Sequence, residues 1–274
     1  MTKNITSTSW GPFTATGAGG TYNISEPNGP AAVLLFSDNF SSGDLSKTEN
    51  GFIWGAPSNT SVSTLNPLSG TYSLLFDFQY TVAGEQRFDM GSLYNELTFE
   101  YEIYIPDGTE SWGGLIYDHY NSEGGASDNN KWHRLWDTNT ESGNDEKVGA
   151  STRASDTTGL SKLSAEWDDD TTGVTGQTPP SAYQDFITAA DRGTWIKLKF
   201  YYKSATVANN DGVLKFYKDD VLIMSKTDVN NYHAGYDHAW QYGYLLGSQG
   251  GKLPMAGDHL YLFIDNFSLW SGEA

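Results

Sequence analysis

The stretch NELTFEYEIYIP (95–106) decides the fold class. Its side chains alternate at a period of two, with Leu97, Phe99, Tyr101, Ile103 and Ile105 on one face and Glu96, Thr98, Glu100, Glu102 and Tyr104 on the other. An antiparallel strand with one buried and one solvated face has this pattern. We therefore predict a sheet whose apolar face packs against a second layer.

The same period recurs along the chain, in TYSLLFDFQY (71–80), GTWIKLKFYYK (193–203) and HLYLFIDNFSLW (259–270). The segment GVLKFYKDDVLIMSK (212–226) predicts a hairpin that turns at Lys218-Asp219-Asp220. The echo between FSDNFSSG (36–43) and FIDNFSLWSG (263–272) predicts two neighbouring strands of one sheet. A single helix is expected at 181–193, and the polar residues 138–180 are expected to form a long excursion between strands. These patterns predict an all-β, two-sheet antiparallel sandwich over residues 31–274, preceded by an extended polar arm at 1–30.

Composition narrows the function classes. The 274 residues carry 34 acidic and 16 basic side chains, a formal charge of −18, which disfavours nucleic acid and anionic lipid as partners. There is no cysteine, so disulfides and thiolate metal sites are excluded. No apolar run reaches the ~20 residues that span a bilayer, and the N-terminus lacks the apolar region of a signal peptide. We expect no membrane partner.

The stretch NNKWHRLWD (129–137) gathers two tryptophans and three basic side chains in an acidic chain. Regular strand alternation places Lys131 and His133 on one face, and Trp132, Arg134 and Trp136 on the other. Either face could bind a ligand, or one face could pack in the core while the other is simply solvated. The pattern leaves both alternatives open.

Four stretches together resemble a known superfamily: GEQRFDMG (84–91) with NELTFEYEIYIPDG (95–108), NNKWHRLWD (129–137), GTWIKLKFYYK…DGVLKFYKDDVLI (193–223) and GYLLGSQGG…LYLFIDNFSLW (243–270). They are similar to the concanavalin A-like jelly rolls, which include laminin G-like modules and polysaccharide lyases. The resemblance implies a jelly-roll sandwich. It says less about activity, because this fold hosts enzymes, lectins and structural modules.

The catalytic motifs of that superfamily are not intact. The alginate-lyase branch carries an R-x-E-L-R strand, a Q-x-H strand and a C-terminal Tyr/Lys strand. Here Arg87 has no second arginine nearby, Lys131 precedes His133 where glutamine is expected, and Tyr242-Gly-Tyr244 lacks the lysine. The E-x-D-x-x-E strand of the retaining hydrolases is also absent. The prediction therefore leans away from an enzyme.

Three kinds of site are predicted. If the chain is a lyase, β-elimination requires groups that neutralise a uronate and a group that moves a proton, which are here Arg87, Lys131, His133 and Tyr244. Carbohydrate binding needs aromatic rings and polar groups, supplied by Trp132, Arg134, Trp136, Tyr236, His238 and Trp240. No cofactor is required, but the resemblance implies a structural calcium ion where the first and last strands meet, at Asp38 and Asp265.

Three functions follow as hypotheses. The leading one is a non-catalytic surface or assembly module, a virion (phage capsid or tail) decoration or glycan-binding protein. Its partner would be a carbohydrate, a protein surface or a capsid or tail lattice, with homo-oligomerisation through residues 1–30 and a virion or extracellular location. The alternatives are a polysaccharide lyase that acts on an acidic glycan and an exported, adhesin-like carbohydrate-binding module.

Overall fold

The computed structural model describes residues 13–17, 20–24, 31–79, 84–106, 130–137, 147–153, 162–169, 174–177, 184–206, 210–231, 239–247 and 259–274. Within these ranges the chain forms strands and connecting turns, with one short 3₁₀ helix, η2 (Ala189–Asp191), and no α-helix. No helix in the described part has the length and apolar character needed to cross a membrane. The predicted all-β class is confirmed.

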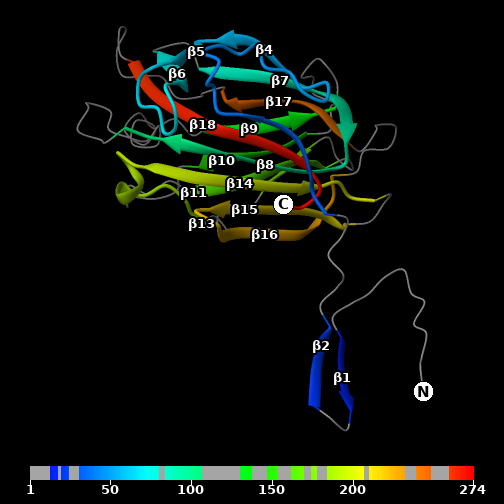
Figure 1. Ribbon diagram of the computed structural model, residues 1–274. Helices are drawn as coiled ribbons and strands as arrows, with labels where there is room; N and C mark the ends of the chain where they lie inside the picture. Colours follow the sequence, from blue (N-terminus) through cyan, green and yellow to red (C-terminus); the bar gives the residue numbers. More distant parts are fainter. Residues whose placement is uncertain are drawn as a thin grey trace.

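Two antiparallel sheets make up the sandwich (Figure 1). Sheet I has the order β12-β11-β10-β9-β17-β7-β4, with β13 paired to β11. Its strands are β4 (Ile53–Ser58), β7 (Glu85–Tyr94), β9 (Asn130–Trp136), β10 (Lys147–Arg153), β11 (Lys162–Asp169), β12 (Val174–Gln177), β13 (Gln184–Asp185) and β17 (Trp240–Leu246).

Sheet II has the order β16-β15-β14-β8-β18-β6-β5, with β3 paired to β18. Its strands are β3 (Val33–Asp38), β5 (Thr60–Ser63), β6 (Ser73–Gln79), β8 (Glu96–Tyr104), β14 (Trp195–Lys203), β15 (Gly212–Lys218), β16 (Val221–Val229) and β18 (His259–Ser271). Two further strands, β1 (Phe13–Gly17) and β2 (Gly20–Ile24), pair with each other as a hairpin. This hairpin lies in the segment for which the sequence predicted an irregular arm.

The core lies between the inward faces of the two sheets. In β8 the side chains of Leu97, Phe99, Tyr101 and Ile103 are fully buried, as the alternation predicts. Aromatic rings fill much of this space, and Phe36 stacks on Phe52 with 3.8 Å between ring centroids. Burial of such rings supplies most of the hydrophobic stabilisation of a sandwich of this size.

Two local predictions are confirmed by strand pairing. The echoed segments are neighbours, because β3 pairs with β18 in a register that sets Asp38 opposite Phe267. The hairpin between β15 and β16 turns at Asp219 and Asp220, whose φ angles are 48° and 64°. Positive φ at both central residues is the backbone of a type I′ turn, which matches the twist of the flanking strands.

Two other predictions were wrong. Residues 138–180 were expected to be an excursion, but the described parts contain β10, β11 and β12. These strands are hard to recognise in the sequence because their outward positions hold serine, glycine and glutamate, with few large apolar residues between them. The helix expected at 181–193 is also absent from its described part, where β13 pairs with β11 and Phe186 and Ile187 are buried in the core. Tertiary packing overrides the local helical pattern there.

Candidate functional site

A bulge in β9 decides which of its side chains face the core. Lys131 pairs with Ser151, and His133 pairs with Ala150. Ser151 and Ala150 are consecutive in β10, so Trp132 is an extra residue in β9 that has no partner in the register. The extra residue turns two consecutive side chains, Trp132 and His133, toward sheet II. Such a bulge re-aims every side chain beyond it.

The face assignments predicted from regular alternation are therefore wrong. Lys131 shares the outer face of sheet I with Arg134 and Trp136, whereas Trp132 lies on the inner face. The ring of Trp132 packs edge-on against Phe186 at 5.1 Å. Trp132 is thus a core residue, and its placement does not support a direct contact with a sugar.

His133 is also a core residue. Its ring packs against Phe99 at 4.5 Å and Phe200 at 4.2 Å, and its Nε2 atom hydrogen-bonds to the hydroxyl of Tyr202. Burial, with a smaller contribution from the charge of Arg134, lowers the pKa of His133 well below its usual value. The imidazole is therefore neutral, and it cannot join Lys131 at a common site.

The outer face of sheet I carries a row of side chains in cross-strand register. Tyr244 of β17 lies opposite Arg87 of β7 on one side and Arg134 of β9 on the other. The ammonium of Lys131 lies 5.9 Å from the Tyr244 ring centroid. Tyr244 is thus flanked by three cationic side chains, and sheet I brings together three of the four residues predicted for catalysis.

Trp136 lies in the next row of the same face. Its ring centroid lies 5.6 Å from Tyr244 and 6.3 Å from Tyr242, and the Arg87 guanidinium sits 5.5 Å over its ring. Trp136 and Tyr244 are almost fully buried, with exposed fractions of 2% and 0%, although neither belongs to the core between the sheets. The outer face of sheet I therefore has an aromatic cluster of its own.

A buried polar network holds Arg134. Its Nη2 atom donates to Oε2 of Glu166 at 2.9 Å, and the Ser151 hydroxyl donates to Oε1 of the same carboxylate at 2.6 Å. Glu166 is only 3% exposed. A buried carboxylate that accepts bonds from both sides fixes the guanidinium in one orientation.

Arg87 is held differently. Its Nε atom donates to Glu85 at 2.6 Å, and 46% of its side chain is exposed. An exposed pair of this kind is worth little to stability, and the side chain of Arg134 is less accessible, with 15% of it exposed. Arg87 is thus the more accessible of the two arginines in the row.

Glu166 and Ser151 were missed in the sequence because they lie in the polar segment expected to be an excursion. The signal was the alternation in KLSAEWDD (162–169), where Leu163, Ala165 and Trp167 are buried in the core. Glu166 falls between two of these inward positions. Its outward direction could have been predicted once the segment was recognised as a strand.

The remaining predicted residues divide into two groups. Trp240 is fully buried, and its ring packs in the core 6.2 Å from Tyr202, which does not support sugar binding. Tyr236 and His238 lie outside the described residues.

Asp38 and Asp265 lie on neighbouring strands of sheet II, β3 and β18, and each carboxylate already accepts hydrogen bonds from the protein. Asp38 accepts from the Phe40 amide at 2.8 Å and the Trp54 indole at 2.9 Å. Asp265 accepts from the amides of Leu68 and Ser69, both at 3.1 Å. Burial raises the pKa of Asp265 above its usual value. Among the described residues no group of three or more acidic, histidine or cysteine side chains could hold a metal ion, so the calcium site stays a prediction.

No family model and no curated protein matches this chain. Solved structures do match it over nearly its full length. The alginate lyase vAL-1 from Chlorella virus is 11% identical with a TM-score of 0.59, over 87% of this chain and all of that chain.

Further solved polysaccharide lyases share this jelly-roll fold. An endo-β-1,4-glucuronan lyase from the fungus Trichoderma reesei is 11% identical with a TM-score of 0.57, over 88% of this chain and 96% of that chain. A variant of the alginate lyase Aly36B, in which a lysine and a tyrosine are replaced by alanine, is 14% identical with a TM-score of 0.57 over the same shares. That variant was solved in complex with alginate tetrasaccharide. Identities this low establish the jelly-roll fold and no more.

Proposed function

We propose that the outer face of sheet I binds an acidic polysaccharide and cleaves it by β-elimination. The observation that carries the proposal is the position of Tyr244, which is flanked by Arg87, Arg134 and Lys131. The chain as a whole has a formal charge of −18. The three cations around this phenol outnumber the two carboxylates described beside them, Glu85 and Glu166, so this face is locally positive in an acidic chain, as an anionic substrate requires.

Each side chain has a role in this chemistry. The cations of Arg87 and Lys131 hold the uronate carboxylate and stabilise the negative charge that develops on it when the C5 proton leaves. Tyr244 acts as a phenolate that takes that proton and then, as the neutral phenol, delivers it to the glycosidic oxygen. The C5–H electron pair becomes the C4=C5 double bond as the C4–O bond breaks, so the products are an unsaturated uronate end and a free hydroxyl.

The buried network positions this machinery. Glu166 and Ser151 hold the Arg134 guanidinium beside Tyr244, and Trp136 packs against the Tyr244 ring. Because Tyr244 is fully buried, the proposal requires that this face opens when substrate binds. The alginate tetrasaccharide bound by an Aly36B variant of the same fold supports an acidic polysaccharide as the ligand.

The test is the appearance of unsaturated uronate, followed by its ultraviolet absorbance, when the full chain is incubated with alginate or polyglucuronate. We expect Tyr244→Phe and Lys131→Ala each to lower kcat by ~10²-fold or more, as loss of a proton-transfer or charge-stabilising group does. Lys215→Ala removes the same charge from the outer face of sheet II and should leave the rate unchanged.

A chain that forms no unsaturated product from any acidic polysaccharide would refute the lyase proposal. If calorimetry then detects binding of the same polysaccharides, with loss in Lys131→Ala, the chain is the non-catalytic glycan-binding module predicted from its sequence. The predicted virion or adhesin role and the predicted homo-oligomer stay predictions, because no described contact bears on them.

A further inference from the structure

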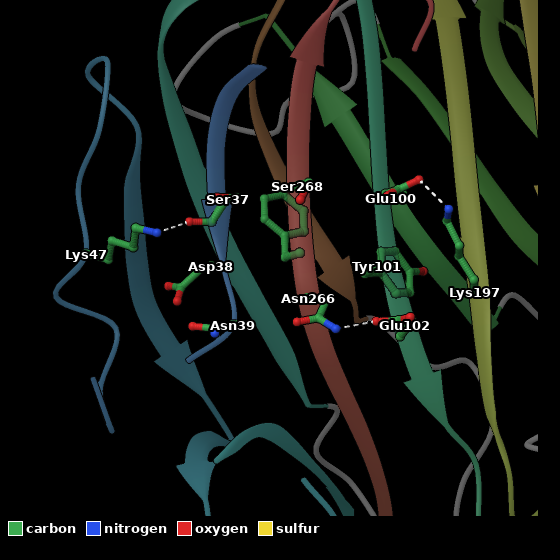
Figure 2. Close-up of a pocket in the computed structure, with 11 residues that line it drawn as sticks. Ser37, Asp38, Asn39, Lys47, Glu100, Tyr101, Glu102, Lys197, Asn266 and Ser268 are labelled. Atoms are coloured by element: carbon green, nitrogen blue, oxygen red, sulfur yellow. Dashed lines mark hydrogen bonds and ion pairs between the residues drawn. The ribbon is translucent and has the colours of Figure 1, made fainter. Parts of the chain in front are cut away.

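A polar pocket of about 460 Å³ lies on the outer face of sheet II (Figure 2). The candidate site lies on the outer face of the other sheet, on the opposite side of the sandwich. Side chains from β3, β8, β14 and β18 and from the segment after β3 line it. Its polar and charged side chains include Asn39, Lys47, Glu100, Glu102, Lys197 and Asn266. The pocket takes no part in the proposed lyase chemistry.

A second β-bulge shapes the pocket. Asp265 pairs with Glu102 and Ser268 with Glu100, so β18 carries one residue more than β8 across this step. Asn266 takes up the extra length with a φ of 49°. Its side-chain amide donates to Oε2 of Glu102 at 2.6 Å and fixes the direction of that carboxylate (Figure 2).

The groups that this pocket offers to a ligand are hydrogen-bond acceptors, because its lysines are already paired. Lys197 lies 3.3 Å from Oε2 of Glu100 and 3.0 Å from Asp220, and Lys47 donates to the carbonyl of Ser37. Both lysines are therefore committed. Within the described part of the chain no hydrogen bond reaches the Oε1 atoms of the two glutamates, which leaves a pair of acceptors two residues apart on one strand face.

An aromatic row borders the pocket. In the register of sheet II, Trp195 lies opposite Tyr104 and Tyr104 lies opposite Phe263. The ring centroid of Tyr104 lies 5.7 Å from that of Trp195 and 6.1 Å from that of Phe263. Tyr104 and Trp195 are both partly exposed. Tyr104 comes two positions after Glu102 in β8, and Trp195 comes two positions before Lys197 in β14, so each ring lies on the same strand face as its pocket residue.

We propose that this surface, which we call the sheet II site, binds a neutral saccharide. Apolar pyranose faces pack on partly exposed aromatic rings, and vicinal hydroxyls donate to carboxylate oxygens, which are strong acceptors when ionised. Two glutamates whose free oxygens face the ligand repel a uronate. The two faces of the sandwich thus differ in the sugars they take, with cations around Tyr244 on sheet I and acceptors beside an aromatic row on sheet II.

Isothermal titration calorimetry of the full chain with the hexasaccharides of β-1,4-glucan, β-1,4-mannan and β-1,4-xylan tests this inference. We expect at least one of the three to bind. Trp195→Ala and Glu102→Gln should each weaken binding by about tenfold, as the loss of one stacking ring or of one charge-assisted hydrogen bond predicts. Lys215→Ala, on the same sheet but outside the pocket, is the matched control and should bind as the wild type does.

The inference is overturned if none of the three hexasaccharides binds the wild type, or if binding survives both substitutions. Glu102→Gln preserves the side-chain shape, so it remains informative if Trp195→Ala does not fold, which a thermal melt reveals. Lys131→Ala separates the two proposals. It should lower the rate of acidic-polysaccharide cleavage by ~10²-fold or more and leave neutral hexasaccharide binding intact. Loss of that binding would assign both ligands to sheet I.

Discussion

Stability between pH 7 and pH 5 should depend on His133 in a way that a surface histidine would not produce. The imidazole lies between the sheets against Phe99 and Phe200, and its hydrogen bond to Tyr202 serves the neutral ring. Its pKa is well below the usual value in the folded chain, because burial penalises the charged form. The unfolded chain restores the ordinary value of about 6.5.

The sign and size of the effect follow from proton linkage. Below about pH 6.5 the unfolded state takes up a proton at this position that the folded state does not, so stability is complete above that pH and falls as the pH drops. The loss approaches about 1.4 kcal/mol per pH unit. Between pH 7 and pH 5 it amounts to about 1.9 kcal/mol from this single side chain.

The double variant His133→Leu/Tyr202→Phe isolates this contribution, because it removes the titrating ring together with the hydroxyl that would lose its partner. Urea unfolding, followed by tryptophan fluorescence, should be measured for both proteins at several pH values from 7 to 5. The free energy of unfolding should fall by about 1.9 kcal/mol more in the wild type than in the variant. Equal pH dependences would refute the placement of a neutral His133 in the core, and with it the bulge that turns the side chain inward.

Three further outcomes are expected. In Gly243→Ala the new Cβ would lie 2.7 Å from Cε2 of Phe88. Overpacking should therefore lower the free energy of unfolding in urea by about 1–3 kcal/mol. An unchanged unfolding midpoint would mean that β17 is not packed as described. Glu166→Gln weakens the charge-assisted hydrogen bonds that Arg134 and Ser151 donate to this carboxylate and should cost about 2 kcal/mol in the same assay. An unchanged free energy of unfolding would contradict the buried position of this pair. Added calcium should leave the thermal midpoint unchanged, because the carboxylates of Asp38 and Asp265 already accept hydrogen bonds from backbone amides or an indole. A rise in the midpoint that a chelator reverses would establish the ion predicted from the family resemblance.

The sequence by itself determined most of the strands that make up sheet II. In β8 and β14 every second residue is large and apolar, and the inward faces run as the alternation predicts, from Leu97 to Ile103 and from Ile196 to Phe200. The hairpin at Asp219-Asp220 and the pairing of β3 with β18 were visible for the same reason. The sequence of a strand with one buried face shows which side chains point into the core, because burial selects apolar side chains at a period of two.

Only the tertiary structure decided the candidate site. The bulge in β9 arises from its pairing with β10 and leaves no mark on the local pattern, so Lys131 and His133 were assigned to one face although they lie on opposite sides of sheet I. Glu166 and Ser151 belong to strands with small and polar outward residues, which composition alone does not separate from loops. Tyr244 gains its cationic neighbours from strands far away in the chain. Alternation along one strand is local, whereas register between strands depends on the packing of the whole sandwich.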